Sequence, residues 1–100
     1  MGTLVVSEEI LEIIRELGFA DIREVLVEHL MTEILCRISD FQQEASHFED
    51  KYGRPFEEVK SQYEKGQEDF EFYDDLMAWQ FAIEGLEYWK KRLEELKSAI

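Results

Sequence analysis

Apolar residues recur in alternating steps of four and three between residues 21 and 52, which is the heptad spacing of a single apolar helix face. The residues on this face are Val27, Met31, Ile34, Ile38, Phe41, Ala45, Phe48 and Tyr52. Leu26, Leu30 and Leu35 flank the face and widen it beyond a two-stranded coiled-coil seam, as in a helix packed in a bundle. We predict a long central helix over 21–52. At roughly 45 Å it needs a partner along its length, from this chain or from a second copy.

A second long helix is predicted over residues 69–98, again from the spacing of apolar residues. Near one of its faces lie Phe72, Leu76, Trp79, Ala82 or Ile83, Leu86, Trp89, Leu93, Leu96 and Ile100. The spacing slips once, at Ala82-Ile83, which would rewind a coiled coil locally. Between the two long helices, Gly53 suits a helix C-terminus and Pro55 cannot continue a helix. Residues 55–65 are therefore predicted to form a short helix of their own.

The first 20 residues have the pattern of a helical arm. Ser7 is suited to cap a helix, and the acids Glu8 and Glu9 favour the positive end of the helix dipole. A strongly apolar face follows, made of Ile10, Leu11, Ile13, Ile14 and Leu17. Gly18 then ends the helix. Ahead of Ser7, the stretch 3–6 (TLVV) is β-prone.

These elements predict an all-α fold in a single helical domain, residues 1–100. Its parts are an N-terminal arm (1–20), the central helix (21–52), a short helix (55–65) and a C-terminal helix (69–98). We expect the two long helices to form an antiparallel hairpin, with the short helix bridging them. One short N-terminal strand is an optional addition.

Charge narrows the classes of partner. The chain carries 11 Lys and Arg against 24 Asp and Glu, a net charge of −13. Such a chain repels a phosphate backbone, because nucleic-acid affinity comes mainly from cations that displace counterions. It also lacks the cationic face of a membrane-surface helix and any apolar run long enough to span a bilayer. No signal peptide opens the sequence, so we expect a cytoplasmic protein that binds neither nucleic acid nor membrane.

No group of residues in the sequence points to catalysis. There is no Gly-rich phosphate loop, no zinc-ligand spacing and no nucleophile with a neighbouring base. The single cysteine, Cys36, is interpreted as a partly buried, inert thiol. Glu44 and His47 have the spacing of one ligand pair in a di-iron bundle, and only a homodimer could supply the second pair. We expect a non-enzymatic protein without cofactor or metal.

The middle of the predicted C-terminal helix is acidic and aromatic. Between Gly66 and Tyr88 it has several acids and no Lys or Arg, and its aromatic residues occupy more than one face. Such a helix is buried on several sides or offers a face to a partner. The candidates for partner binding are Phe70, Tyr73, Asp74, Asp75, Met77 and Phe81. The candidates for dimerisation come from the central helix and are Val27, Met31, Ile34, Ile38, Phe41 and Phe48.

Two parts of the chain resemble known proteins. Residues 3–31 have a β-prone stretch, Ser-Glu-Glu, an apolar helix, Gly-Phe and a second helix, and they resemble the N-terminal half of ribbon-helix-helix-like antitoxins. Residues 51–59 (KYGRPFEEV) and 68–79 (EDFEFYDDLMAW) resemble small prokaryotic antitoxin-like proteins of toxin–antitoxin systems. One departure matters, because no Lys or Arg precedes Arg15. Ribbon-helix-helix proteins that bind operators read DNA with polar or basic residues on the strand.

The resemblance implies a homodimer or higher oligomer that dimerises through its N-terminal half and holds a toxin with later segments. We therefore predict an antitoxin-like protein–protein interaction module that binds and neutralises a basic toxin partner. Two alternatives stay open. One is a ribbon-helix-helix-type transcriptional regulator, which basic residues on the strand would have supported. The other is a dimeric helical protein that binds metal through carboxylates and His.

Overall fold

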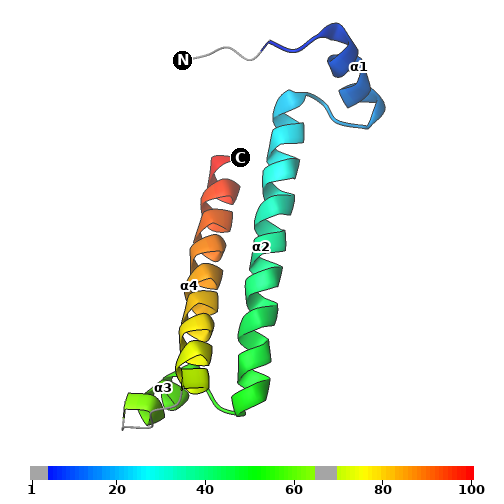
Figure 1. Cartoon of the computed structure of the whole chain (residues 1–100). Coiled ribbons are helices and arrows are strands. Elements are labelled where there is room, and N and C mark those ends of the chain that lie inside the picture. Colours follow the sequence, from blue (N-terminus) through cyan, green and yellow to red (C-terminus); the bar gives the residue numbers. More distant parts are fainter. Residues whose placement is uncertain (1–4, 65–69) are drawn as a thin grey trace.

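The computed structural model describes residues 5–64 and 70–100, and within them it contains four helices (Figure 1). These are α1 (Glu8–Glu16), α2 (Ile22–Tyr52), α3 (Phe56–Glu64) and α4 (Phe70–Ala99). The predicted all-α fold is confirmed, and both ends of α2, the start of α3 and the end of α4 lie within one residue of the predicted bounds. The predicted ends at positions 65 and 69 lie outside the described residues. So do positions 3 and 4 of the optional strand, whereas Val5 and Val6 form no strand.

Side chains just ahead of α1 and α2 hold the first turns of these helices. The Ser7 hydroxyl accepts a hydrogen bond from the backbone N–H of Ile10 at 3.4 Å. The Asp21 carboxylate accepts one from the backbone N–H of Glu24 at 2.9 Å. Because the first N–H groups of a helix have no acceptor within the helix, these contacts fix where each helix begins.

Glycines with a left-handed backbone end the same two helices. Gly18 has a φ of 92° and Gly53 a φ of 64°, a region that side chains with a Cβ rarely adopt. At Gly53 the chain leaves α2, and α3 begins directly after Pro55. The short α3 is therefore turned back against the hairpin at the point that the sequence predicts.

α2 and α4 lie side by side and antiparallel (Figure 1). At one end the Arg23 side chain donates to the backbone carbonyl of Ala99 at 3.3 Å. At the other end the rings of Tyr52 and Phe72 meet with their centroids 5.6 Å apart. We call the first the arm end, because α1 adjoins it, and the second the α3 end. The partner that the long α2 helix needs is thus α4 of the same chain.

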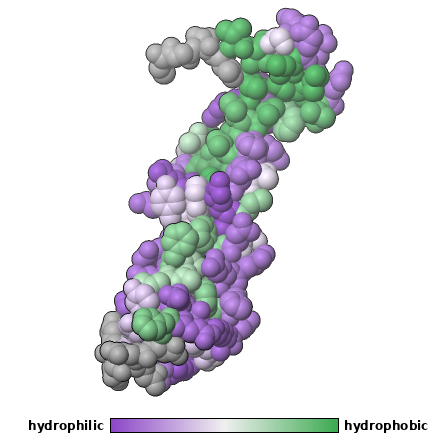
Figure 2. All heavy atoms as spheres, in the orientation of Figure 1, coloured by the Kyte–Doolittle hydropathy of each residue, from purple (hydrophilic) through white to green (hydrophobic). Residues whose placement is uncertain are grey.

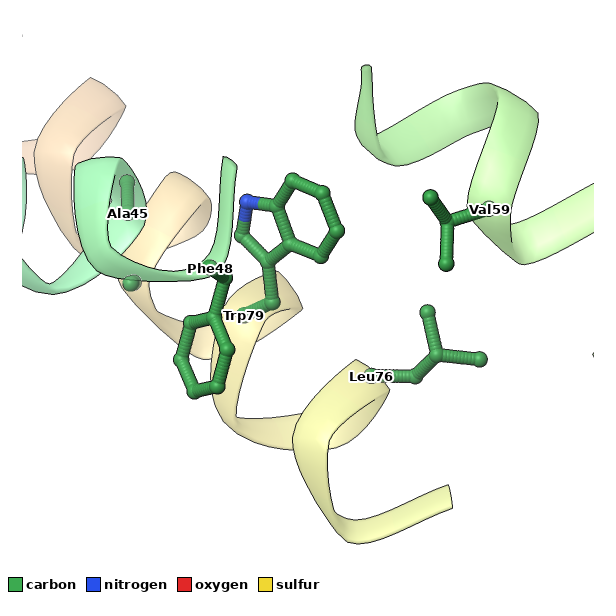
Figure 3. Close-up of a cluster of buried hydrophobic side chains, with 6 residues drawn as sticks. Ala45, Phe48, Val59, Leu76 and Trp79 are labelled. Carbon is green, nitrogen blue, oxygen red and sulfur yellow. The ribbon is translucent and has the colours of Figure 1, made fainter. Parts of the chain in front are cut away.

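The hydrophobic core lies at the α3 end, where α3 packs over the hairpin (Figure 3). Its buried residues are Ala45, Phe48, Val59, Leu76, Trp79 and Ala82. The rings of Phe48 and Tyr52 stack on the fully buried Trp79, with centroids 6.0 and 5.8 Å away. Phe56 of α3 meets Trp79 edge-on at 5.3 Å. Trp79, which the apolar spacing places on the core face of the C-terminal helix, therefore ties three helices together.

Small residues on α4 let the two long helices approach each other beyond this core. Ala82 is fully buried, and a Cβ built on Gly85 would lie only 2.6 Å from ring atoms of Phe41. The same ring meets Phe81 edge-on, with centroids 5.7 Å apart. The slip in apolar spacing thus falls where α4 presents small residues to α2.

Toward the arm end the hairpin is much less covered. The radius of gyration is 20.5 Å, against about 13 Å for a compact chain of this length. Four seam residues in this part of α2 are only half-buried: Val27, Met31, Ile34 and Ile38. Leu26 and Leu30 beside them are each 50% exposed. One end of the hairpin therefore has a closed core, and the other leaves apolar surface open.

Candidate interaction surfaces

One face of α4 carries large apolar side chains that the hairpin does not cover. Four predicted partner-binding residues share it, and we call them the aromatic stripe: Phe70, Tyr73, Met77 and Phe81. Phe70 is 91% exposed, Phe81 63%, and Tyr73 and Met77 each 43%. Met77 and Phe81 lie two residues to either side of Trp79. At about 100° per residue this turns both of them away from the side of α4 that carries Trp79.

Two members of the aromatic stripe also make contacts within the chain. The ring of Tyr73 lies 5.8 Å from the ring of Tyr63 on α3. The ring of Phe81 lies 5.7 Å from that of Phe41 on α2. Phe70 is the most exposed of the four, so its truncation would remove the least packing from the fold.

The two predicted acidic partner residues have different roles. Asp75 accepts a hydrogen bond from the Lys51 ammonium at 2.6 Å and one from the Tyr52 hydroxyl at 2.5 Å. These contacts, that of Lys51 first, hold the pKa of Asp75 below its usual range. The hydrogen bond to Asp75 likewise raises the pKa of Lys51. Asp75 therefore fastens α4 to the end of α2, whereas Asp74 faces solvent.

The predicted dimerisation residues fall into two groups. Phe41 and Phe48 pack within the chain, since Phe48 is buried in the core and Phe41 lies against Gly85. The other four are half-buried in the half of α2 nearer the arm: Val27, Met31, Ile34 and Ile38. Much of the apolar seam is therefore used by the contact with α4, which leaves less of it for a second copy.

The candidate metal pair and the cysteine lie on the surface. Glu44 and His47 are exposed, and the His47 ring meets Phe48 edge-on at 5.3 Å. In residues 5–64 and 70–100, no group of three or more His, Cys, Asp or Glu side chains is placed to hold a metal ion. Cys36 is exposed rather than partly buried. The reason is that two residues beyond Ile34 it lies about 200° around the helix from the seam.

An open groove of about 470 Å³ runs between α2 and α4 near the arm end. It is lined by Leu30, Glu33, Ile34, Arg37, Trp89, Arg92, Glu95 and Leu96. The guanidinium of Arg37 lies 5.2 Å from the centroid of the Trp89 ring. Arg92 donates to the Tyr88 hydroxyl at 3.2 Å and to the Glu95 carboxylate at 2.8 Å. The groove thus combines apolar side chains with two guanidinium groups and two carboxylates.

The arm helix leaves most of its apolar face open. Ile14 is buried, at 6% exposed. Three further apolar residues, which we call the arm face, are open to solvent: Ile10 is 49% exposed, Ile13 53% and Leu17 70%. Figure 2 shows hydrophobic residues gathered over α1 and the adjoining end of α2. Apolar surface gathered in this way is typical of a site that binds another protein or a second copy.

No protein-family model, curated protein or solved structure matches the chain. The resemblance of residues 51–59 and 68–79 to antitoxin-like proteins therefore stays a prediction. In the structure, 51–59 joins α2 to α3, and the described part of 68–79 opens α4 and carries most of the aromatic stripe. Among the described helices, none has both the length and the apolar character that crossing a membrane requires.

Spacing along the sequence predicts the aromatic stripe but neither the groove nor the open arm face. Amphipathic spacing identifies an apolar face on α1 without telling how much of that face finds a partner in the same chain. A signal for the groove exists in Arg37 and Trp89, since Arg and Trp are favoured in interfaces. They stand 52 positions apart, and only the register of the hairpin brings them together.

Proposed function

We propose that this chain is a non-enzymatic, antitoxin-like protein–protein interaction module that binds a basic protein partner through the aromatic stripe. The exposure of Phe70, Met77 and Phe81 on one side of α4 supports this function most directly. A few aromatic anchors that become buried on binding supply most of the energy of an interface. Large apolar residues at steps of three and four along a helix suit a partner that lies along α4.

The charge around the stripe favours a basic partner. Asp74 lies four residues after Phe70, and Glu84 three residues after Phe81, so both exposed acids neighbour the stripe. From its first residue to Tyr88, α4 has no Lys or Arg. Acidic residues around apolar anchors speed the encounter with a basic surface and disfavour acidic competitors. A toxin with a basic surface fits this chemistry, and its neutralisation is the activity that we propose.

The test compares two truncations against a defined partner, the product of a toxin-like reading frame that adjoins the gene for this chain. Calorimetry should show binding of that product to the wild-type chain. Phe70→Ala should weaken the binding by roughly 1–3 kcal/mol, about 5- to 150-fold in Kd, because it removes an anchor. Leu35→Ala on α2 is the control, since Leu35 is 48% exposed and lies outside the stripe. It should leave the Kd unchanged.

A charge variant separates anchoring from steering. Asp74→Lys should chiefly slow association and lessen its salt dependence. Tyr73→Ala is a less clean probe, because Tyr73 contacts Tyr63 and its truncation also removes packing from the fold. Equal weakening by Phe70→Ala and Leu35→Ala, or no binding to the wild-type chain, would refute the proposed function.

A further inference from the structure

We propose that a second copy of this chain covers the arm end, with the arm face of each copy packed into the groove of the other. In this arrangement the aromatic stripe and the arm end bind different partners. The aromatic stripe begins at the first residue of α4, at the α3 end, whereas the groove and the arm lie at the arm end. A dimer at the arm end would leave the stripe free for a different partner.

The exposed area of the chain exceeds that of a compact monomer by about twice the share that one protein contributes to an interface of standard size. The accessible surface is 7790 Å² for a chain of 12.0 kDa. A compact monomer of that mass exposes about 6,000 Å², so the excess is about 1,800 Å². Half of that excess, about 900 Å², already equals the share that one protein contributes to an interface of standard size. The arm end holds exposed apolar side chains that such an interface would cover.

The arm face and the groove match in length. The arm face runs from Ile10 to Leu17, and the groove runs from Leu30 to Arg37 on one side and from Trp89 to Leu96 along the other. Each of these stretches is eight residues long, and its ends lie about 10 Å apart along a helix axis. One short helix therefore fits the groove from end to end, with its apolar side chains against the apolar lining.

Among the described residues, the groove offers the acidic arm of another copy one cation without an acidic partner, Arg37, because Arg92 already pairs with Glu95 and the lining also holds Glu33. α1 carries four glutamates and one arginine, Arg15. Within residues 5–64 and 70–100 none of these glutamates forms an ion pair, and neither does Arg37 in the groove. Glu9 and Glu16 neighbour the arm face, four and three residues from Ile13. Packing of the arm into the groove would bring these carboxylates toward Arg37.

The short length of α1 is a further reason to expect a partner. A helix of nine residues is marginal in water on its own and needs tertiary packing of its apolar face. In this chain α1 buries Ile14, while the arm face stays open. A groove on a second copy would supply the packing that the rest of the arm lacks.

Reciprocal exchange gives a closed assembly. Each copy offers one arm and one groove, so a two-fold dimer satisfies both at once and leaves neither open for a third copy. The predicted dimer is retained in this arrangement, but its contact moves from the apolar seam to the arm. Ile34 is the one predicted dimerisation residue that lines the groove.

The decisive experiment measures the oligomeric state of the full chain by sedimentation at micromolar concentrations. The wild type should sediment at twice the mass of the 12.0 kDa chain. Two charge-reversal variants are compared: the single variant Arg37→Glu and a double variant that carries both Glu9→Arg and Glu16→Arg. Each should raise the dimer dissociation constant at least tenfold. All of these residues are exposed, so the variants should keep their helix content by circular dichroism. A chain that carries all three substitutions should recover the wild-type dimer dissociation constant to within threefold, because the two reversed charges again attract each other.

Two controls are matched to these changes. Lys91→Glu makes the same change in net charge as Arg37→Glu at an exposed position outside the groove, and it should leave the dimer intact. Phe70→Glu places a charge on the aromatic stripe and should also leave the dimer intact. A monomeric wild type would overturn the proposal, as would a Lys91→Glu effect as large as that of Arg37→Glu. Failure of the combined variant to recover the dimer would overturn the pairing of arm and groove.

Discussion

Gly85 offers a test of the contact between α2 and α4. We expect Gly85→Ala to destabilise the wild-type chain and to stabilise a chain that lacks the Phe41 ring. In the middle of a helix, replacement of Gly by Ala normally stabilises by about 1 kcal/mol, because Ala has the higher helix propensity. Here the added Cβ would lie 2.6 Å from two atoms of the Phe41 ring and 2.8 Å from a third. These distances are well inside van der Waals contact, so the ring or the helix must move.

Overpacking of this kind costs about 1–3 kcal/mol. We therefore expect Gly85→Ala to lower the free energy of unfolding of the wild-type chain, by up to about 2 kcal/mol after the gain in propensity. In a Phe41→Ala background the ring is absent and only the propensity term remains. The same substitution should then raise the free energy of unfolding by about 0.5–1 kcal/mol.

Urea denaturation followed by circular dichroism measures both differences, at one fixed protein concentration so that any dimer contributes equally. The interaction energy between the two sites should be about 1–3 kcal/mol. If Gly85→Ala stabilised the chain equally in both backgrounds, Phe41 would not lie against Gly85. The antiparallel register that places these two residues together would then be wrong.

Two further predictions concern charge and metal. The pKa of Asp75 is lowered in the folded chain, so its contribution to stability is present above the ordinary value of 3.8 and is lost as the pH falls through the lower folded value. Asp75→Asn should therefore reduce the free energy of unfolding at pH 7, with a difference from wild type that shrinks below pH 3.8, whereas Asp74→Asn should change it little at either pH. Chelation should leave the melting temperature unchanged. A fall that iron or manganese reverses, and that is absent in His47→Ala, would instead support the dimeric metal-binding alternative.

The helices and the apolar faces of the two long helices could be predicted, because each depends on residues close together in the sequence. Ser7, Asp21 and Gly53 mark helix ends by local hydrogen bonding and backbone geometry. The spacing around Trp79 marks the buried face of α4. The contact of Gly85 with Phe41 could not be predicted, since it depends on the register between helices that are far apart in the chain.

The surfaces likewise divide into features that a local pattern predicts and features that depend on contacts between helices. The aromatic stripe follows from spacing on one helix, and the structure leaves all four of its members exposed. Asp74 and Asp75 are adjacent and chemically identical, so the sequence does not distinguish them. Their roles differ because Lys51 and Tyr52 of α2 donate hydrogen bonds to Asp75. The groove requires two helices in register, so no local pattern in either helix announces it.

The position of α3 at only one end of the hairpin gives the chain two very different rates of opening. Backbone amides near Phe48 and Trp79 should exchange with solvent only when the whole chain unfolds, because these residues lie in the closed core. Amides of α1 should exchange through a local detachment of the arm that breaks few contacts. If two copies shield each other's arms, exchange of α1 becomes concentration-dependent, and newly made, dilute chains are the ones whose arms are most open to proteases.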